Sequence, residues 1–223
     1  MATTFRSRAR RICAVTVLTA VAITGCGRFD RDGSVDIGPV AGATLAVVGV
    51  QYDATLHLRT EPGNDQPVAA SLGSLEHNLS ATGKTREVDS SQWFEVKADG
   101  VKGWADSRSL AYLGTTEDVT RRIVDKLGRT PTAVSMLELG RIVTTADAST
   151  QPPVSRITVT VAPTTAGGVG EVTYDVVGFA DDSVLGERLH VLGKPGEKFT
   201  LIRVIATPFC RRGVAGNNPR LCV

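Results

Sequence analysis

Short stretches of β-branched and apolar residues recur between residues 44 and 113, and Gly, Pro, Asn and Asp separate the stretches. This pattern is typical of short strands joined by tight turns. Strands are expected at 45–50, 56–59, 68–72, 79–82, 93–97 and 103–105. Because short, evenly spaced strands of this kind commonly close on themselves, the pattern predicts a small β-barrel over 44–113.

The pattern changes at Gly114 and becomes helical. Apolar residues fall on one face of a helix over 119–127. Thr115 or Thr116 is placed to cap the start of this helix, and Gly128 is placed to end it. A second domain is therefore expected to begin here.

Beyond this helix, Thr130 and Pro131 form a second helix-start signal, and the rest of the chain is predicted to form strands. Apolar residues alternate with polar ones over 156–161 and 171–176, so each of these strands is expected to expose one polar face. The segment 198–207 has apolar residues at both odd and even positions, so both faces of this strand are expected to be covered. This places it centrally in the sheet, under the helices. These elements predict an α+β domain over 114–223 with an antiparallel sheet of about four strands.

Four motifs follow one another in the N-terminal region: LHLRTEPG at 56–63, VAASLGSL at 68–75, WFEV at 93–96 and GWADSRSL at 103–110. In this order they resemble bacterial SH3-like domains. Such domains often bind cell-wall peptidoglycan or its peptides, so the resemblance implies a wall-binding module. The expected fold is mainly β, with a small SH3-like barrel followed by the α+β domain.

The candidate ligand contacts in this region are Arg59, Glu61, Trp93 and Trp104. Aromatic side chains in a small barrel more often fill the core than form a binding platform, so both interpretations of the tryptophans stay open. His57 and Glu61 depart from the family, which commonly has Asn and a small residue at these positions. A barrel that only packs against its neighbour is an equally good interpretation.

The N-terminus carries Arg6, Arg8, Arg10 and Arg11 before an uncharged segment at 12–24. A basic start and a short apolar stretch indicate a secretory signal, since a membrane-spanning helix needs about 20 residues. Ile23-Thr24-Gly25-Cys26 resembles the lipobox of bacterial lipoproteins. The resemblance implies cleavage between Gly25 and Cys26 and attachment of fatty acyl chains, such as palmitate, to Cys26. An ordinary signal peptide with an incidental cysteine is the alternative.

This interpretation divides the chain into a signal peptide at 1–25, a lipidated cysteine with a flexible tether at 26–43, and the two domains. The expected location is the extracytoplasmic face of the cell membrane, held by lipid. Removal of the signal takes away four arginines and no acidic residue, so the formal charge changes from +2 to −2. No basic cluster remains to follow a phosphate backbone, and nucleic acid is not an expected partner.

Cys210 and Cys222 remain as a pair once Cys13 and Cys26 are assigned to the signal and the lipid. Outside the cytoplasm such a pair usually forms a disulfide. Two free thiols are the next interpretation. A metal site comes last, because it needs about four ligands and no histidine lies nearby.

The sequence offers little for catalysis. His57, His77 and His190 have no metal-ligand spacing, and no nucleophile elbow or phosphate-binding loop occurs. Asp181-Asp182 fits a polar turn better than a pair of catalytic acids. The sequence therefore predicts a non-enzymatic envelope lipoprotein without metal or cofactor. Its expected partners are the membrane and either peptidoglycan or an envelope protein; an accessory subunit or inhibitor of a wall hydrolase, or an unrecognised hydrolase, is the alternative.

Overall fold

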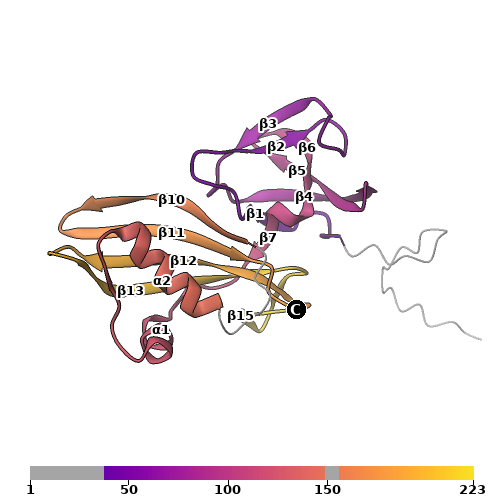
Figure 1. Cartoon of the computed structure of the whole chain (residues 1–223). Helices are drawn as coiled ribbons and strands as arrows, with labels where there is room; N and C mark the ends of the chain where they lie inside the picture. The colour runs from indigo at the N-terminus through magenta and orange to yellow at the C-terminus, as the bar shows by residue number, and fades with distance from the viewer. Residues whose placement is uncertain (1–37, 149–155) are drawn as a thin grey trace, which may run out of the picture. The chain divides into compact units, whose positions relative to one another are not determined.

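A computed structural model describes residues 38–148 and 156–223 (Figure 1), and these belong to one compact unit that begins at Ile37. The predicted signal peptide and the lipidation site at Gly25-Cys26 lie outside the described residues. None of the helices within the described ranges has the length and apolar character needed to cross a membrane.

Most of the described chain forms one antiparallel sheet that curls like half of a barrel. Its strand order is β10-β11-β12-β13-β7-β1-β4-β5-β6-β2-β3, and β8 and β9 also pair with β13. The strands are β1 (Thr44–Val47), β2 (Leu56–Arg59), β3 (Val68–Leu72), β4 (Leu79–Val88), β5 (Ser91–Ala98), β6 (Val101–Asp106), β7 (Leu110–Leu113), β8 (Glu117–Asp118), β9 (Thr132–Ala133), β10 (Arg156–Ala166), β11 (Val169–Val177), β12 (Val184–Lys194) and β13 (Phe199–Cys210). A separate hairpin joins β14 (Val214–Ala215) to β15 (Asn218–Cys222).

The predicted fold, a small SH3-like barrel followed by an α+β domain with its own four-stranded sheet, is wrong. The short strand β7 overturns it. Leu110 and Ala111 pair with β1, whereas Tyr112 and Leu113 pair with β13, so β7 joins the strands of 44–113 to those of the C-terminal half. Because one strand serves both halves, the sheet continues through the predicted domain boundary.

The predicted strand positions in 44–113 are close to the observed ones, except that β4 runs on to Val88. Gly83 allows this, since it adopts a left-handed φ of 84° where the register between β4 and β5 shifts. Phe94, Val96 and Ala105 face the apolar core of this region. The paired registers of β5 and β6 place Trp93 and Trp104 together on the opposite face of these strands.

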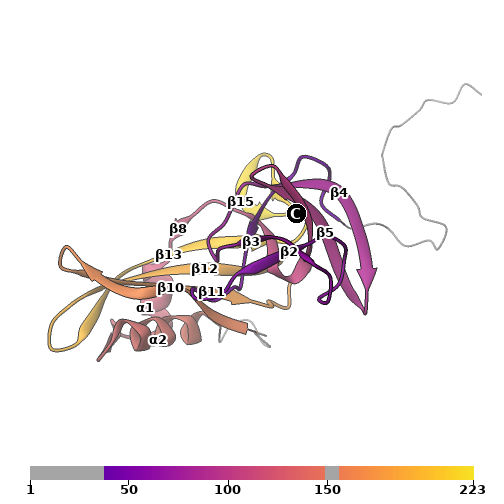
Figure 2. The same cartoon turned by 90° about the horizontal axis from the view of Figure 1, so that it is seen from above.

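Two helices, α1 (Thr120–Leu127) and α2 (Met136–Ala148), cover one face of β10–β13 (Figure 2). Ile123, Leu139 and Val143 are buried there with the apolar side chains of β11, β12 and β13. Gly140 lets α2 approach the sheet, because a Cβ at this position would clash with Tyr174 and lie 2.9 Å from Val172 Cγ1. Gly128 ends α1 in the left-handed conformation, as expected, whereas α1 begins at Thr120 rather than after Thr115 or Thr116.

The other face of β11 and β12 packs against the 44–113 region. Val177, Leu185 and Phe209 are buried there with Val48 and Ala111. Asp175, which the alternating pattern predicts to be exposed, is completely buried on the same face. The predicted disulfide is confirmed: Cys210 at the end of β13 is bonded to Cys222 of β15, with 5.1 Å between their Cα atoms.

A short 3₁₀ helix, η1 (Ser107–Ser109), connects β6 to β7. Asp106 precedes it and accepts a hydrogen bond from the backbone N–H of Arg108 at 2.9 Å.

Candidate functional site

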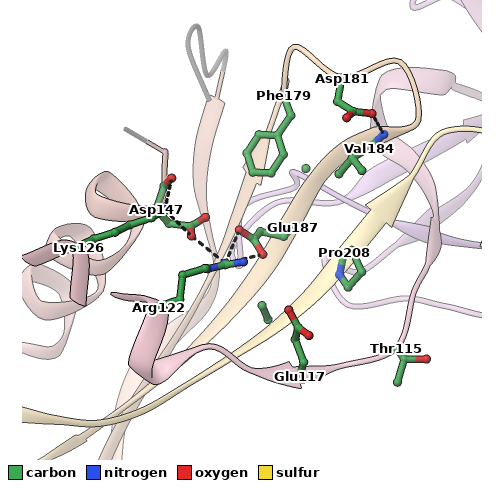
Figure 3. A pocket seen from close by; sticks show the side chains of 12 residues that line it. Thr115, Glu117, Arg122, Lys126, Asp147, Phe179, Asp181, Val184, Glu187 and Pro208 are labelled. Carbon is green, nitrogen blue, oxygen red and sulfur yellow. Dashed lines mark hydrogen bonds and ion pairs between the residues drawn. The ribbon is translucent and has the colours of Figure 1, made fainter. Parts of the chain in front are cut away.

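A cavity of about 250 Å³ opens on the helix-covered side of the sheet (Figure 3). Arg122 and Lys126 reach it from α1, Asp147 from the end of α2, Glu187 from β12, and Glu117 from β8. The loop that follows β11 contributes Phe179 and Asp181. The cavity therefore gathers charged side chains from segments that are far apart in the sequence.

The start of α1 places the two basic side chains. Asp118 Oδ1 accepts hydrogen bonds from the Thr120 N–H and hydroxyl at 3.0 and 2.6 Å, and Arg203 Nε donates to Asp118 Oδ2 at 2.8 Å. Hydrogen bonds from Thr120 and Arg203 lower the pKa of Asp118 to about 2. Since side chains four residues apart share one face of a helix, Arg122 and Lys126 both point toward Asp147.

Asp147 occupies an unfavourable position for an acid. It lies in the last turn of α2, where the backbone carbonyls give the helix end a partial negative charge and no basic residue belongs to that turn. The compensation comes from α1: Arg122 Nη2 lies 2.8 Å from Asp147 Oδ1, and Lys126 Nζ donates to the Asp147 carbonyl oxygen at 3.3 Å. Asp147 is thereby fixed between two cations although it is only 3% exposed.

Glu187 shares the same guanidinium. Arg122 Nη2 lies 3.0 and 3.1 Å from the two carboxylate oxygens of Glu187, as the dashed lines in Figure 3 show. Burial raises the pKa of Glu187 to about 8, and the hydrogen bond and negative charge of Asp147 act in the same direction, while Arg122 opposes them. Burial lowers the pKa of Arg122, but the carboxyl groups of Glu187 and Asp147 together raise it above its ordinary value.

Two buried acids thus compete for one arginine beside a cavity. Near neutral pH the Glu187 carboxyl retains a proton, because both acids cannot be charged at low cost in this setting. A group with a pKa close to neutrality can give up or take up a proton when the charge beside it changes. The site can therefore couple the arrival of a charged ligand to the release of a proton.

The candidate contacts predicted from the sequence lie elsewhere, on β2, β5 and β6 and in the loop after β2. Arg59 pairs in register with Trp104, and its Nη1 donates to the Gln66 carbonyl at 2.8 Å. Glu61 forms an exposed ion pair with Arg86 at 3.0 Å, and the Arg86 guanidinium lies 5.5 Å from the centre of the Trp104 ring. Trp93 and Trp104 are only 3% and 5% exposed.

The histidines do not gather at a site. His57 contacts the Ser71 hydroxyl and His190 contacts Glu171, both at the surface. Within residues 38–148 and 156–223, no group of three or more His, Cys, Asp or Glu side chains could hold a metal ion. Asp181 forms a turn, accepting hydrogen bonds from the Ser183 and Val184 N–H groups at 2.7 and 2.8 Å.

Sequence reasoning missed Arg122, Asp147 and Glu187. Glu187 is a polar residue in an alternating strand, and Asp147 follows a helical stretch, so each looks like an exposed charge. One feature of the sequence could have pointed to this site. Asp147 is an acid at the C-terminal end of a helix, where its charge is unfavourable, so a basic side chain from another element is expected beside it.

The fold and this cavity define a mainly β protein with a buried, proton-sharing acid–arginine site. Comparisons of the chain with models of known protein families, with curated proteins and with solved structures gave no match.

Proposed function

We propose that this protein is a non-catalytic binding protein of the bacterial cell envelope, held on the extracytoplasmic face of the membrane by lipid on Cys26. The lipobox at 23–26 supports the anchor. The disulfide between Cys210 and Cys222 supports an oxidising compartment, since such bonds rarely persist in the cytosol. The cavity of Figure 3 is the proposed binding site.

The proposed binding site rests on one observation, which is that acidic side chains outnumber basic ones in the lining of the cavity. Four acids, Glu117, Asp147, Asp181 and Glu187, line it against two cations, Arg122 and Lys126. Hydrogen bonds from Val184 and Ser183 and the charge of Arg211 lower the pKa of Asp181, so with Arg211 counted one negative charge is in excess when Glu187 is ionised. A ligand with a basic nitrogen would correct this imbalance and, by its charge, favour loss of the Glu187 proton.

The proposed ligand is accordingly a peptide that carries an ammonium group. The residues around the cavity also include Phe179, Val184 and Pro208, which can contact the aliphatic part of such a side chain. This choice agrees with the expectation that the protein meets peptidoglycan or its peptides. A contact between residues 44–113 and the wall remains part of the proposal, with Arg59, Glu61 and Arg86 as its charged groups and Trp93 and Trp104 beneath them.

Calorimetry with the mature chain, carrying Cys26→Ser so that it stays in solution, tests the binding site. A short lysine-containing peptide should bind and release a proton, seen as a binding heat that depends on the ionisation enthalpy of the buffer. The Nε-acetylated peptide should bind at least about 10-fold more weakly, which corresponds to a single lost charge contact. Equal affinity for both peptides would rule out the ammonium site.

A matched pair of variants assigns the proton. Glu187→Gln should remove the proton release, whereas Glu171→Gln, at an exposed acid on β11, should leave it unchanged. The non-catalytic role is tested separately with purified wall sacculi. Release of soluble fragments by the unchanged protein, stopped by Glu187→Gln, would identify a hydrolase instead.

Wall contact is measured by co-sedimentation of the same chain with sacculi. We expect Arg86→Gln to weaken it, because the substitution removes the exposed charge above Trp104. Arg121→Gln, at a 95% exposed side chain on α1, is the control. No co-sedimentation by the unchanged chain would remove the wall from the proposal.

A further inference from the structure

A second cavity, of about 300 Å³, is lined by residues from both halves of the chain. Its apolar lining includes Phe94 of β5, Leu110 of β7 and Leu185 of β12. Three arginines, Arg108, Arg211 and Arg212, line it as well, and we call this cavity the arginine groove. It combines apolar surface with an unusual concentration of guanidinium groups.

The disulfide holds two of these arginines in place. Arg211 and Arg212 directly follow Cys210, and the bond to Cys222 closes the loop that they begin. The Arg211 N–H donates to the Ser183 carbonyl at 2.9 Å, and its Nε donates to the Asp181 carbonyl at 3.2 Å. The Nε bond, together with a bond from Nη2 to the Phe179 carbonyl at 3.4 Å, fixes the direction of the Arg211 side chain.

The other two arginines are exposed and bonded to acids. The Arg212 guanidinium lies 3.4 Å from Asp182, whose side chain is 89% exposed. Arg108 binds Asp106, and the Arg108 side chain is 71% exposed. Both ion pairs are open to water, where such pairs contribute little stability, so an arriving phosphate can replace either carboxylate. Hydrogen bonds from Val184 and Ser183 and the charge of Arg211 lower the pKa of Asp181, so a third carboxylate lies beside the three guanidinium groups.

The tether enters the described structure near this groove. Ala41 lies beside Gly83, where an added Cβ would be 3.1 Å from the Ala41 nitrogen. Gly83 is two residues before Thr85, which pairs with Phe94 of the groove. Eleven residues separate Cys26 from Gly38, and this length of chain can span at most about 40 Å. A lipid on Cys26 would therefore keep the groove within reach of the membrane surface.

We propose that the arginine groove binds the phosphate headgroup of an anionic phospholipid in the membrane that holds the anchor. Guanidinium groups bind phosphate oxygens through charge-assisted hydrogen bonds, and the apolar lining can take the start of an acyl chain. This inference rests on the anchoring part of the proposed function. Binding there would give the tethered protein one preferred orientation on the membrane.

Vesicle co-sedimentation tests the inference with the mature chain carrying Cys26→Ser, so that no lipid anchor contributes. Vesicles that contain phosphatidylglycerol should bind the chain, whereas vesicles of phosphatidylcholine should not. Arg211→Gln with Arg212→Gln should weaken the binding about 10- to 30-fold, as expected for the loss of two basic residues at an anionic surface. Added salt should also weaken it.

The matched control is Arg121→Gln with Arg141→Gln, which removes two exposed arginines from α1 and α2. Circular dichroism and a thiol assay show whether each variant keeps its fold and disulfide. Equal binding to both kinds of vesicle, or an equal loss in the control, overturns the inference. So does binding of inorganic phosphate to the groove without any preference for anionic vesicles.

The result of the vesicle experiment can be distinguished from the results for the lipid anchor and for the cavity of Figure 3. Cell fractionation of Cys26→Ala tests the anchor alone, and calorimetry with the lysine peptide tests the cavity of Figure 3 alone. Anionic vesicles would still bind the non-lipidated chain if either of those tests failed.

Discussion

Two arginines meet buried acids on opposite faces of the same sheet, and they do so differently. Arg188 of β12 binds Asp175 through two parallel contacts, Nε to Oδ1 at 2.7 Å and Nη2 to Oδ2 at 2.9 Å. Arg122 instead binds two acids, Asp147 and Glu187, through one nitrogen. Glu187 and Arg188 are neighbours on β12, so their side chains point to opposite faces.

The network around Arg188 satisfies its members with backbone groups. Arg188 Nη2 also donates to the carbonyl oxygens of Val47 and Ser74 at 3.1 and 3.2 Å, and the Gly49 N–H donates to Asp175 Oδ2 at 2.7 Å. One acid balances one arginine, and the pair fixes the 44–113 region against β11 and β12. This is the arrangement expected of a structural contact.

In the network around Arg122, Lys126 also lies beside Asp147, whereas Glu187 has only the guanidinium that it shares with Asp147, and the network borders a cavity. Burial without full compensation is costly, and the protein meets that cost by keeping a proton on Glu187. The comparison suggests a general distinction: a balanced buried pair stabilises the fold, whereas an unbalanced pair beside a cavity is poised to respond to a ligand.

The largest effect should come from breaking the balanced pair. Arg188→Met leaves Asp175 buried without its partner and should lower the free energy of unfolding by about 3–5 kcal/mol. Urea unfolding measures this change. The double variant Asp175→Asn with Arg188→Met should lose less, because no uncompensated charge remains. A loss below about 1 kcal/mol in the single variant would show that the pair does not hold the two regions together.

Breaking the unbalanced network should cost less. Arg122→Met should lower the free energy of unfolding by about 1–2 kcal/mol near pH 6, a common size for a single substitution. The loss stays moderate because Glu187 can keep its proton and Lys126 remains beside Asp147. The loss should grow at higher pH, where Glu187 would otherwise ionise beside Arg122. If the two arginine variants lose equal stability at pH 6, the contrast between the networks is wrong.

Because the pKa of Glu187 is raised in the folded state, the free energy of unfolding should decrease as the pH rises. The pKa of Glu187 is raised from 4.5 to about 8 in the folded state, so its contribution to stability is complete below about pH 4.5. That contribution is lost as the pH rises toward about 8, with a slope of at most about 1.4 kcal/mol per pH unit. Glu187→Gln has no such slope and should therefore gain stability relative to the unchanged protein as the pH increases.

Denaturant unfolding of both proteins between about pH 5 and about pH 8 measures the difference. Glu171→Gln is the control, because Glu171 lies at the surface beside His190. Parallel pH profiles for the unchanged protein and Glu187→Gln would mean that Glu187 is ionised in the folded state.

Local pattern was enough to place many of the elements. The short apolar stretches and turn residues in 44–113 located strands β1 to β6, Gly128 marked the end of α1, and the cysteine pair predicted the disulfide. Each of these features depends on neighbouring residues or on a simple chemical count. The positions of strands are therefore readable from the sequence in this protein.

The fold was not readable, because the pairing of strands depends on distant partners. β7 has four residues, and nothing in Leu110–Leu113 shows that its two ends pair with different strands. The alternating pattern wrongly predicted that Asp175 is exposed, since the polar face of such a strand usually meets water. In this fold Arg188 and the backbone of residues 47–49 bury the Asp175 side chain. The candidate site depends on the same long-range packing, which brings Arg122 to Asp147 and Glu187.

The smallest expected effect lies at the start of α1, which positions Arg122. Asp118→Ala removes the acceptor for the Thr120 N–H and should lower the free energy of unfolding by about 1 kcal/mol, as for other lost helix caps. The contact with Arg203 adds little because both side chains are about half exposed.

The contribution of Asp118 to stability depends on pH in the opposite direction to that of Glu187. The pKa of Asp118 is lowered from 3.8 to about 2, so its contribution is present above about pH 3.8 and is lost as the pH falls through about 2. Hydrogen exchange at the first turn of α1, compared with Asp125→Asn on the same helix, measures the effect locally. Faster exchange in α1 without a change in the pH profile of Glu187 would show that α1 can loosen at its start while Arg122 stays bound to both acids. If the Glu187 profile shifts as well, the helix start and the acid–arginine site act as one unit.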